Sequence, residues 1–180
     1  VGWRTESLAE LRARLRAQPE GFTEERLRQA YQFQLADLIS IPSVNPMGRD
    51  LEGPEYLEYK VTDYLEKLFQ RQGLRYKRYP IAPKRDNILI RVEGDLPSPE
   101  QGGPLVLLEA HQDTVPVEGM TIPPWTPTQK DGRIYGRGSC DIKGGMAAML
   151  GAMVRLQEEK PRGRPTVVLA KTMKGYAMGE

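Results

Sequence analysis

The spacing of apolar residues predicts two helices in the first half of the chain. The first helix follows Thr23, which suits the N-cap position, and it ends near Ser40. The second helix begins near Pro54 and stops at Gly73. Their apolar faces are formed by Leu27, Tyr31, Leu35, Leu38 and Ile39 in the first helix, and by Leu57, Val61, Tyr64, Leu65 and Leu68 in the second. Each helix therefore has one side to bury against a core.

Short apolar runs predict strands in the remainder of the chain, together with a third helix at residues 142–159. The strands are expected at residues 74–79, 87–92, 105–109, 134–135 and 166–170. The buried side of the third helix carries core-filling residues, namely Met146, Met149, Leu150, Met153 and Val154. Because helices alternate with apolar strands, the pattern predicts an α/β sandwich built on a central sheet.

Composition narrows the class of protein. The 180 residues suffice for one core, and we expect residues 1–21 to form an arm or short amphipathic helix ahead of one domain over 22–180. A net charge of +2, with arginines spread among glutamates, gives no indication of a nucleic-acid partner. No apolar run is long enough for a membrane span, and no secretory signal is visible. The only cysteine, Cys140, excludes an internal disulfide and fits a reducing, cytoplasmic location.

Candidate chemistry gathers around the only histidine, His111, which follows the apolar run LVLLEA. A side chain presented at the end of a strand is well placed to bind a metal ion. Asp113 lies two residues further, so in extended backbone it shares a face with His111 and can fix the imidazole tautomer. Asp141 lies in the glycine-rich segment GRGSCDIKGG, which opens the third helix. His111 and Asp141 are therefore candidate metal ligands, with Asp113 as the residue that orients the histidine.

Each of these motifs alone has a simpler interpretation. A lone histidine is more often a hydrogen-bonded surface residue than a ligand, and a glycine-rich turn can hold an acid incidentally. The segment has no GK[ST] triplet, so we expect Lys143 to be exposed or to donate a local hydrogen bond rather than to bind phosphate. Cys140 could be a nucleophile, but we interpret it as a small buried residue beside the site.

The paired motifs resemble those of the dinuclear zinc aminoacylase/carboxypeptidase metallopeptidase family, which includes acetylornithine deacetylase and succinyl-diaminopimelate desuccinylase. The matching segments are LISIPSVNP, LLEAHQDTVP, WTPTQKDG and IYGRGSCDIKGGMAAML. The resemblance extends from about Leu35 to Ala170. It implies a partial three-layer sandwich with a central, mostly parallel sheet flanked by helices, which would be the N-terminal part of a zinc-hydrolase catalytic domain.

The resemblance also implies a chemistry. His111 would ligate one of two zinc ions, Asp141 would bridge both, and Asp113 would orient His111. Cobalt or manganese could replace zinc at such donors. The peptide bond after Asp141 is a candidate cis bond. The metals would activate a water for hydrolysis of an amide in a small N-acylated amino acid or peptide, and a glutamate would move its proton. Full-length relatives would be homodimers.

The chain departs from the family pattern near its end. Gly175 and Tyr176 stand where the family has a Glu-Glu pair, and Lys174 adds a positive charge. We therefore expect an incomplete hydrolase that alone binds metal weakly and turns over no substrate. The alternatives are a non-catalytic binding or regulatory module that retains the fold, and a carboxypeptidase or dipeptidase of the same architecture.

Overall fold

The computed structural model describes residues 24–160 and 162–172. The arm expected at residues 1–21, the N-cap at Thr23 and the departure at residues 174–176 lie outside them. The described elements, in chain order, are α2 (Glu24–Ser40), α3 (Tyr59–Arg71), β1 (Arg75–Ala82), β2 (Arg85–Val92), a 3-10 turn (Pro99–Gln101), β3 (Leu105–His111), β4 (Thr128–Lys130), β5 (Arg133–Tyr135), a kinked π-helical turn (Ser139–Gly144), α4 (Gly145–Glu159) and β6 (Thr166–Thr172).

Four strands form one sheet in the order β1-β2-β6-β3, and β4 and β5 form a separate hairpin. β3 and β6 run parallel, with Leu105 opposite Thr166 and His111 opposite Thr172. β1 with β2 and β2 with β6 are antiparallel. The predicted α/β class is confirmed, and the four described strands form a mixed sheet in which β3 and β6 make the parallel pairing.

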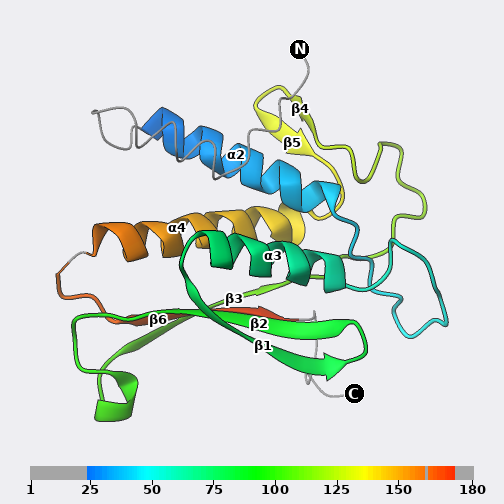
Figure 1. Cartoon of the computed structure of the whole chain (residues 1–180). Helices are drawn as coiled ribbons and strands as arrows, with labels where there is room; N and C mark the ends of the chain where they lie inside the picture. The colour runs from blue at the N-terminus through cyan, green and yellow to red at the C-terminus, as the bar shows by residue number, and fades with distance from the viewer. Residues whose placement is uncertain (1–23, 161, 173–180) are drawn as a thin grey trace.

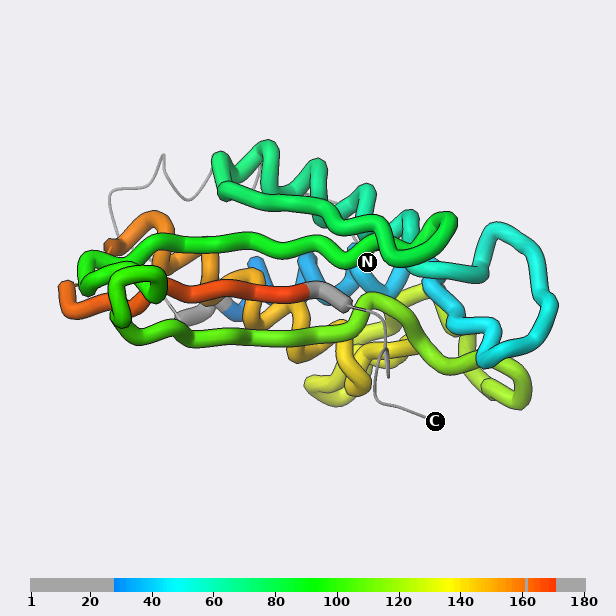
Figure 2. The backbone as a smooth tube through the Cα atoms, turned by 90° about the horizontal axis from the view of Figure 1, so that it is seen from below, coloured from blue at the N-terminus to red at the C-terminus, as the bar shows by residue number. Residues whose placement is uncertain are grey.

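The described helices lie on one face of this sheet (Figure 1). α3 covers β1 and β2, α4 packs on β2, β6 and β3, and α2 packs on α4. The core between these layers is made by Leu38 and Ile39 of α2, Val61, Leu65 and Phe69 of α3, Ile88 and Ile90 of β2, Met146, Leu150 and Met153 of α4, and Leu169 of β6. Seen from below, the strands lie side by side in the order β1, β2, β6, β3, and β3 is the edge strand (Figure 2). Of the described helices, none is long and apolar enough to cross a membrane.

The second predicted helix begins later than expected. α3 starts at Tyr59, because the backbone of residues 55–57 bonds across to Val44: Val44 N–H donates to Glu55 O at 2.8 Å and Leu57 N–H donates to Val44 O at 2.9 Å. Leu57 has a φ of 65° and lies outside the helix, so its predicted place on the helix's apolar face was wrong. The helix ends as predicted at Gly73, whose φ of 61° suits glycine after a helix.

The strand that carries His111 is longer than predicted. β3 continues past Glu109 to His111, because its backbone stays paired with β6 up to Thr172. The third helix, in contrast, begins later, at Gly145, because the backbone at Asp141 and Ile142 leaves helical geometry. These two boundaries define where the candidate residues lie: His111 is the last residue of β3, and Asp141 is in the turn before α4.

Candidate metal centre

His111 ends β3 with its imidazole largely covered; its side chain is 13% exposed. Its Nδ1 lies 2.8 Å from the backbone O of Asp113 and 3.4 Å from Asp113 Oδ1. Asp113 therefore contacts the ring as predicted, with its backbone oxygen nearer than its carboxylate. Both are acceptors, so together they favour a proton on Nδ1 and leave the lone pair on Nε2.

Asp141 approaches the other side of the imidazole. Its Oδ1 lies 3.0 Å from His111 Nε2, although the two residues are thirty positions apart. The Asp141 side chain is 62% exposed, so its carboxylate is accessible from solvent. The Asp141–Ile142 peptide bond is cis, as predicted. The structure thus brings His111, Asp113 and Asp141 together.

The electrostatic surroundings of His111 act in opposite directions. Burial disfavours the charged imidazole, but hydrogen bonds to Asp113 and Asp141 outweigh burial and raise the pKa of His111. A cation at Nε2 is therefore favoured by two nearby carboxylates, whether that cation is a proton or a metal ion.

The loop before α4 depends on glycine for its path. Gly138 has a φ of 78°, and a Cβ there would lie 2.8 Å from Thr114 Cγ2. Gly138 O also accepts the backbone N–H of Lys143 at 2.9 Å. This tight path carries Asp141 to the end of β3.

Two predictions about this loop were wrong. Cys140 is exposed rather than buried, because the kinked turn points it away from the core. Lys143 is 1% exposed, and its Nζ donates to the backbone oxygens of Leu38 and Ile41, each at 2.7 Å. Those carbonyls lie at the end of α2, so Lys143 is a hydrogen-bond donor to a distant segment rather than a surface residue. Burial lowers the pKa of its ammonium to about 7.

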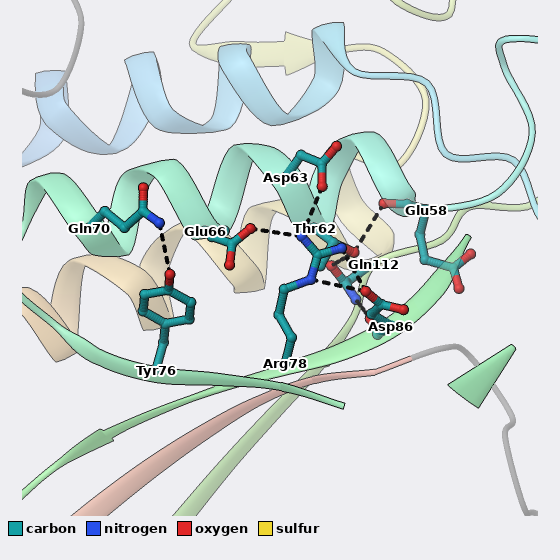
Figure 3. A network of polar contacts seen from close by, with 9 residues as sticks. All are labelled: Glu58, Thr62, Asp63, Glu66, Gln70, Tyr76, Arg78, Asp86 and Gln112. Atoms are coloured by element: carbon teal, nitrogen blue, oxygen red, sulfur yellow. Dashed lines mark hydrogen bonds and ion pairs between the residues drawn. The ribbon is translucent and has the colours of Figure 1, made fainter. Parts of the chain in front are cut away.

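Behind His111, several polar residues that sequence reasoning missed support the HQD segment. Gln112 is fully buried; its Oε1 accepts from Thr62 Oγ1 at 3.0 Å, and its Nε2 donates to Asp86 O at 2.8 Å (Figure 3). Asn45 Nδ2 donates to Asp113 Oδ2, 2.6 Å away. The position of Gln112 between His111 and Asp113 was a signal for the Gln112 contacts, because in extended backbone its side chain faces away from those of His111 and Asp113. Asn45 lies 68 residues from Asp113, and no local pattern indicates that contact.

A buried ion pair lies on the other side of Asp113. Arg85 Nε donates to Glu58 Oε1 at 2.8 Å, and its Nη2 donates to Glu58 Oε2 at 3.0 Å. The same Nη2 lies 3.9 Å from Asp113 Oδ2. Burial raises the pKa of Glu58, and the hydrogen bonds from Arg85 act against that rise. These residues were also missed, since Glu58 and Arg85 are 27 positions apart.

The donor set can now be compared with what a metal ion needs. An imidazole nitrogen and a carboxylate oxygen are suitable ligands for zinc, and they converge here. Within residues 24–160 and 162–172, no three or more His, Cys, Asp and Glu side chains are grouped to hold a metal ion. The described residues therefore fit a metal centre as two of its donors, and the remaining donors would have to come from elsewhere.

Comparisons with known proteins show which family and which folds the chain is similar to. Residues 107–173 match the model of peptidase family M20/M25/M40. A probable succinyl-diaminopimelate desuccinylase of Staphylococcus aureus (strain MRSA252) is 30% identical over 141 residues, which make up 77% of this chain and 30% of that protein. The chain thus spans about a third of the length of the curated relatives it matches.

Solved structures share the fold. A di-peptidase of Saccharomyces cerevisiae superposes with a TM-score of 0.63 at 16% identity, covering 97% of this chain and 36% of that one. A Bacillus subtilis protein described as a dinuclear metal binding peptidase of the M20 family superposes with a TM-score of 0.55 at 14% identity, covering 82% and 36%. The resemblance seen in the motifs is confirmed: the chain is a relative of peptidase family M20/M25/M40, and residues 107–173 are the segment that matches it.

Proposed function

We propose that this chain is the part of a metal-dependent hydrolase that contributes His111 and Asp141 to the metal site. The hydrolase would cleave an amide bond in a small peptide or N-acylated amino acid. The observation that supports it most is the convergence of His111 Nε2 and Asp141 Oδ1 at 3.0 Å, with Nδ1 engaged by Asp113. The relatives support the same class, since they are described as a desuccinylase and peptidases.

The described residues have separate tasks in this proposal. Zinc, or cobalt or manganese in its place, would act as a Lewis acid and make a bound water more acidic. His111 offers Nε2 as a ligand, because its Nδ1 faces the two oxygens of Asp113. Asp141 offers a carboxylate with two oxygens, which suits a bridging position. Asp113 keeps the imidazole ring in place.

Two donors are too few for tight zinc binding, which normally needs three or four protein ligands. We therefore propose that the 180-residue chain alone binds zinc weakly and does not turn over substrate. The same count of donors also allows an alternative, a non-catalytic module that uses Asp141 and His111 to bind a ligand other than a metal ion. The two proposals differ in whether His111 binds a metal ion.

The single histidine makes this testable without ambiguity. Zinc is titrated into the purified 180-residue chain while the imidazole ¹⁵N signals of His111 are followed by NMR. We expect Nε2 to shift on zinc binding, Asp141→Asn to weaken that binding, and Asp131→Asn, an exposed aspartate in the β4–β5 turn, to leave it unchanged. An unchanged Nε2 signal would contradict the metal site.

Turnover is measured on the same samples with N-succinyl and N-acetyl amino acids and with dipeptides, with and without zinc. We expect no hydrolysis above the rate of the Asp141→Asn variant. Zinc-dependent hydrolysis by the unaltered chain would show that further donors are present and that the site is complete.

A further inference from the structure

The ion pair behind Asp113 has an unusual arrangement. Both carboxylates that face Arg85 are buried: the side chains of Glu58 and Asp113 are 2% and 1% exposed. Arg85 binds Glu58 with two parallel hydrogen bonds, the strongest geometry available to a guanidinium. Its distance to Asp113, 3.9 Å, is too long for a hydrogen bond, so that contact is one of charge alone.

This arrangement divides the two oxygens of Asp113. Oδ2 accepts a hydrogen bond from Asn45 and lies closest to the Arg85 charge. Oδ1 lies toward His111 Nδ1 at 3.4 Å. A buried carboxylate needs nearby positive charge or donors to remain stable, and here both act on the oxygen that His111 does not use. Rotation of the Asp113 carboxylate would break the Asn45 contact, so Oδ1 stays on the imidazole side.

Glu58 determines where the Arg85 charge lies. A free guanidinium beside a buried carboxylate would move into bidentate contact with it, and would compete with His111 for both oxygens. Because Glu58 occupies Nε and Nη2 of Arg85, the guanidinium is held one step back from Asp113. Arg85 thereby balances the negative charge of the Asp113 carboxylate, while Oδ1 of Asp113 still faces His111.

We propose that Arg85, clamped by Glu58, is a positioning residue of the candidate metal centre, and that it acts on His111 through Asp113. This inference rests on the proposed function for its consequence, metal binding, but its first effect is on the imidazole of the metal-free chain. Removing the Arg85 charge leaves the Asn45 hydrogen bond alone to hold Oδ2 of Asp113, so the carboxylate is fixed less firmly, the preference for a proton on Nδ1 weakens, and Nε2 becomes a poorer metal ligand.

A matched control is present in the same elements. Arg78 also links α3 to the β1–β2 hairpin, through Asp63, Glu66 and Asp86, and none of its ion pairs involves Asp113 (Figure 3). Arg78→Met therefore removes a cross-link of the same kind from the same pair of elements. If loss of either arginine acted only by loosening the packing of α3 on the hairpin, Arg85→Met and Arg78→Met would change the His111 signals to the same extent.

The test compares Arg85→Met, Glu58→Gln and Arg78→Met in the 180-residue chain. The tautomer of His111 is read from its ¹⁵N shifts without metal, at one fixed alkaline pH where the imidazole is neutral, and zinc affinity is measured by calorimetry. We expect Arg85→Met and Glu58→Gln to reduce the Nδ1–H tautomer and to weaken zinc binding by about 10- to 100-fold, the usual effect of losing a residue that supports a ligand. Arg78→Met should change neither reading.

Thermal unfolding of each variant separates positioning from stability. If Arg85→Met and Arg78→Met shift the His111 signals equally, or if neither does, the positioning role is wrong. If the unaltered chain shows the Nδ1–H tautomer but zinc never shifts Nε2, the metal proposal fails while the positioning of His111 by Arg85 stands.

Discussion

Lys143 is a buried amine that joins the loop of Asp141 to the end of α2. Its Nζ donates to the carbonyl oxygens of Leu38 and Ile41 and lies 5.6 Å from the centre of the Trp125 ring. The last carbonyls of a helix have no partner within the helix, and a positive charge is favourable at that end. The lysine of the DIKGG segment therefore has a structural task that does not require contact with a substrate.

Replacing Lys143 with methionine should destabilise the fold, because the side chain still fills the space but the carbonyls of Leu38 and Ile41 lose the ammonium donor that they share. We expect the free energy of unfolding to fall by about 1–3 kcal/mol. Urea denaturation followed by circular dichroism measures it. Lys130→Met on the exposed strand β4 is the control and should leave the midpoint in place. Equal midpoints for the two variants would show that the Lys143 contacts contribute nothing.

Gly138 offers a second prediction at the scale of one residue. Gly138→Ala meets both a positive φ and a clash with Thr114, whereas Gly119, with a φ of 79°, has nothing within 4 Å of the added Cβ. Gly119→Ala should cost about 1 kcal/mol for the left-handed conformation alone. Gly138→Ala should cost about 1–3 kcal/mol more, because the neighbour must move. Chemical denaturation of both variants measures the difference, and equal losses would contradict the clash.

The sequence indicated some of these residues and could not indicate others. The convergence of His111 and Asp141 was expected because the two motifs together resemble those of a metallopeptidase family, in which both residues would bind metal. Lys143 was predicted to be exposed or to donate a local hydrogen bond, and no local pattern indicates its partners, because the Leu38 and Ile41 carbonyls lie more than a hundred positions away. Arg85 gave no signal, since charged residues are common in hairpin turns.

At the scale of elements, one carboxylate joins the segment after β2 to the segment before β6. Asp95, after β2, accepts the backbone N–H groups of Arg164 at 2.6 Å and Gly163 at 3.1 Å, just before β6. The hydrogen bond from Arg164, with that from Gly163, holds the pKa of Asp95 below its ordinary value of 3.8. The contact therefore favours the ionised carboxylate and joins the ends of two neighbouring strands.

The sign of the pH dependence follows from that shift. The folded state binds the Asp95 proton less readily than the unfolded chain, so this contribution to stability is present above pH 3.8 and is lost as the pH falls through the lower, folded pKa. Asp95→Asn keeps one acceptor oxygen but cannot titrate. We expect the melting temperature of the unaltered chain to fall toward that of Asp95→Asn as the pH is lowered from 6 to below about 3.8. A constant gap between the two curves would contradict this linkage.

Element boundaries show where local pattern is overruled by pairing across the fold. The β3 run LVLLE predicted a strand, but only its partner β6 carries the strand on to His111. The turn at residues 54–58 looked like the first turn of a helix, since Pro54 suits that position. Its backbone groups instead bond to Val44, a contact that no window of neighbouring residues contains. The centres of the helices, set by their apolar stripes, were predicted correctly.

At the scale of the whole molecule, the two edges of the sheet differ. β1 carries Arg75, Lys77, Arg78 and Pro80, residues that discourage another strand from pairing with it. β3 lies at the other edge (Figure 2) and reads LVLLEAH. Because successive side chains of a strand alternate, its exposed apolar residues occupy both of its faces. Leu105, Val106 and Leu107 are 49%, 41% and 62% exposed. Such a run is typical of a strand buried on both faces.

This asymmetry predicts how the 180-residue chain behaves in solution. The described helices lie on one face of the sheet (Figure 1). Leu108 packs against the core beneath them, so its neighbour Leu107, which pairs with Val168 of β6 and is 62% exposed, belongs to the opposite, open face. An exposed apolar edge strand is a site of association. We expect sedimentation velocity to show association that increases with protein concentration. Leu107→Lys should reduce it, because a charge on the edge opposes pairing, whereas Val115→Lys, at an exposed apolar position outside the sheet, should not. A monomer at all concentrations, with a single cooperative melting transition, would show that the β3 edge does not drive association.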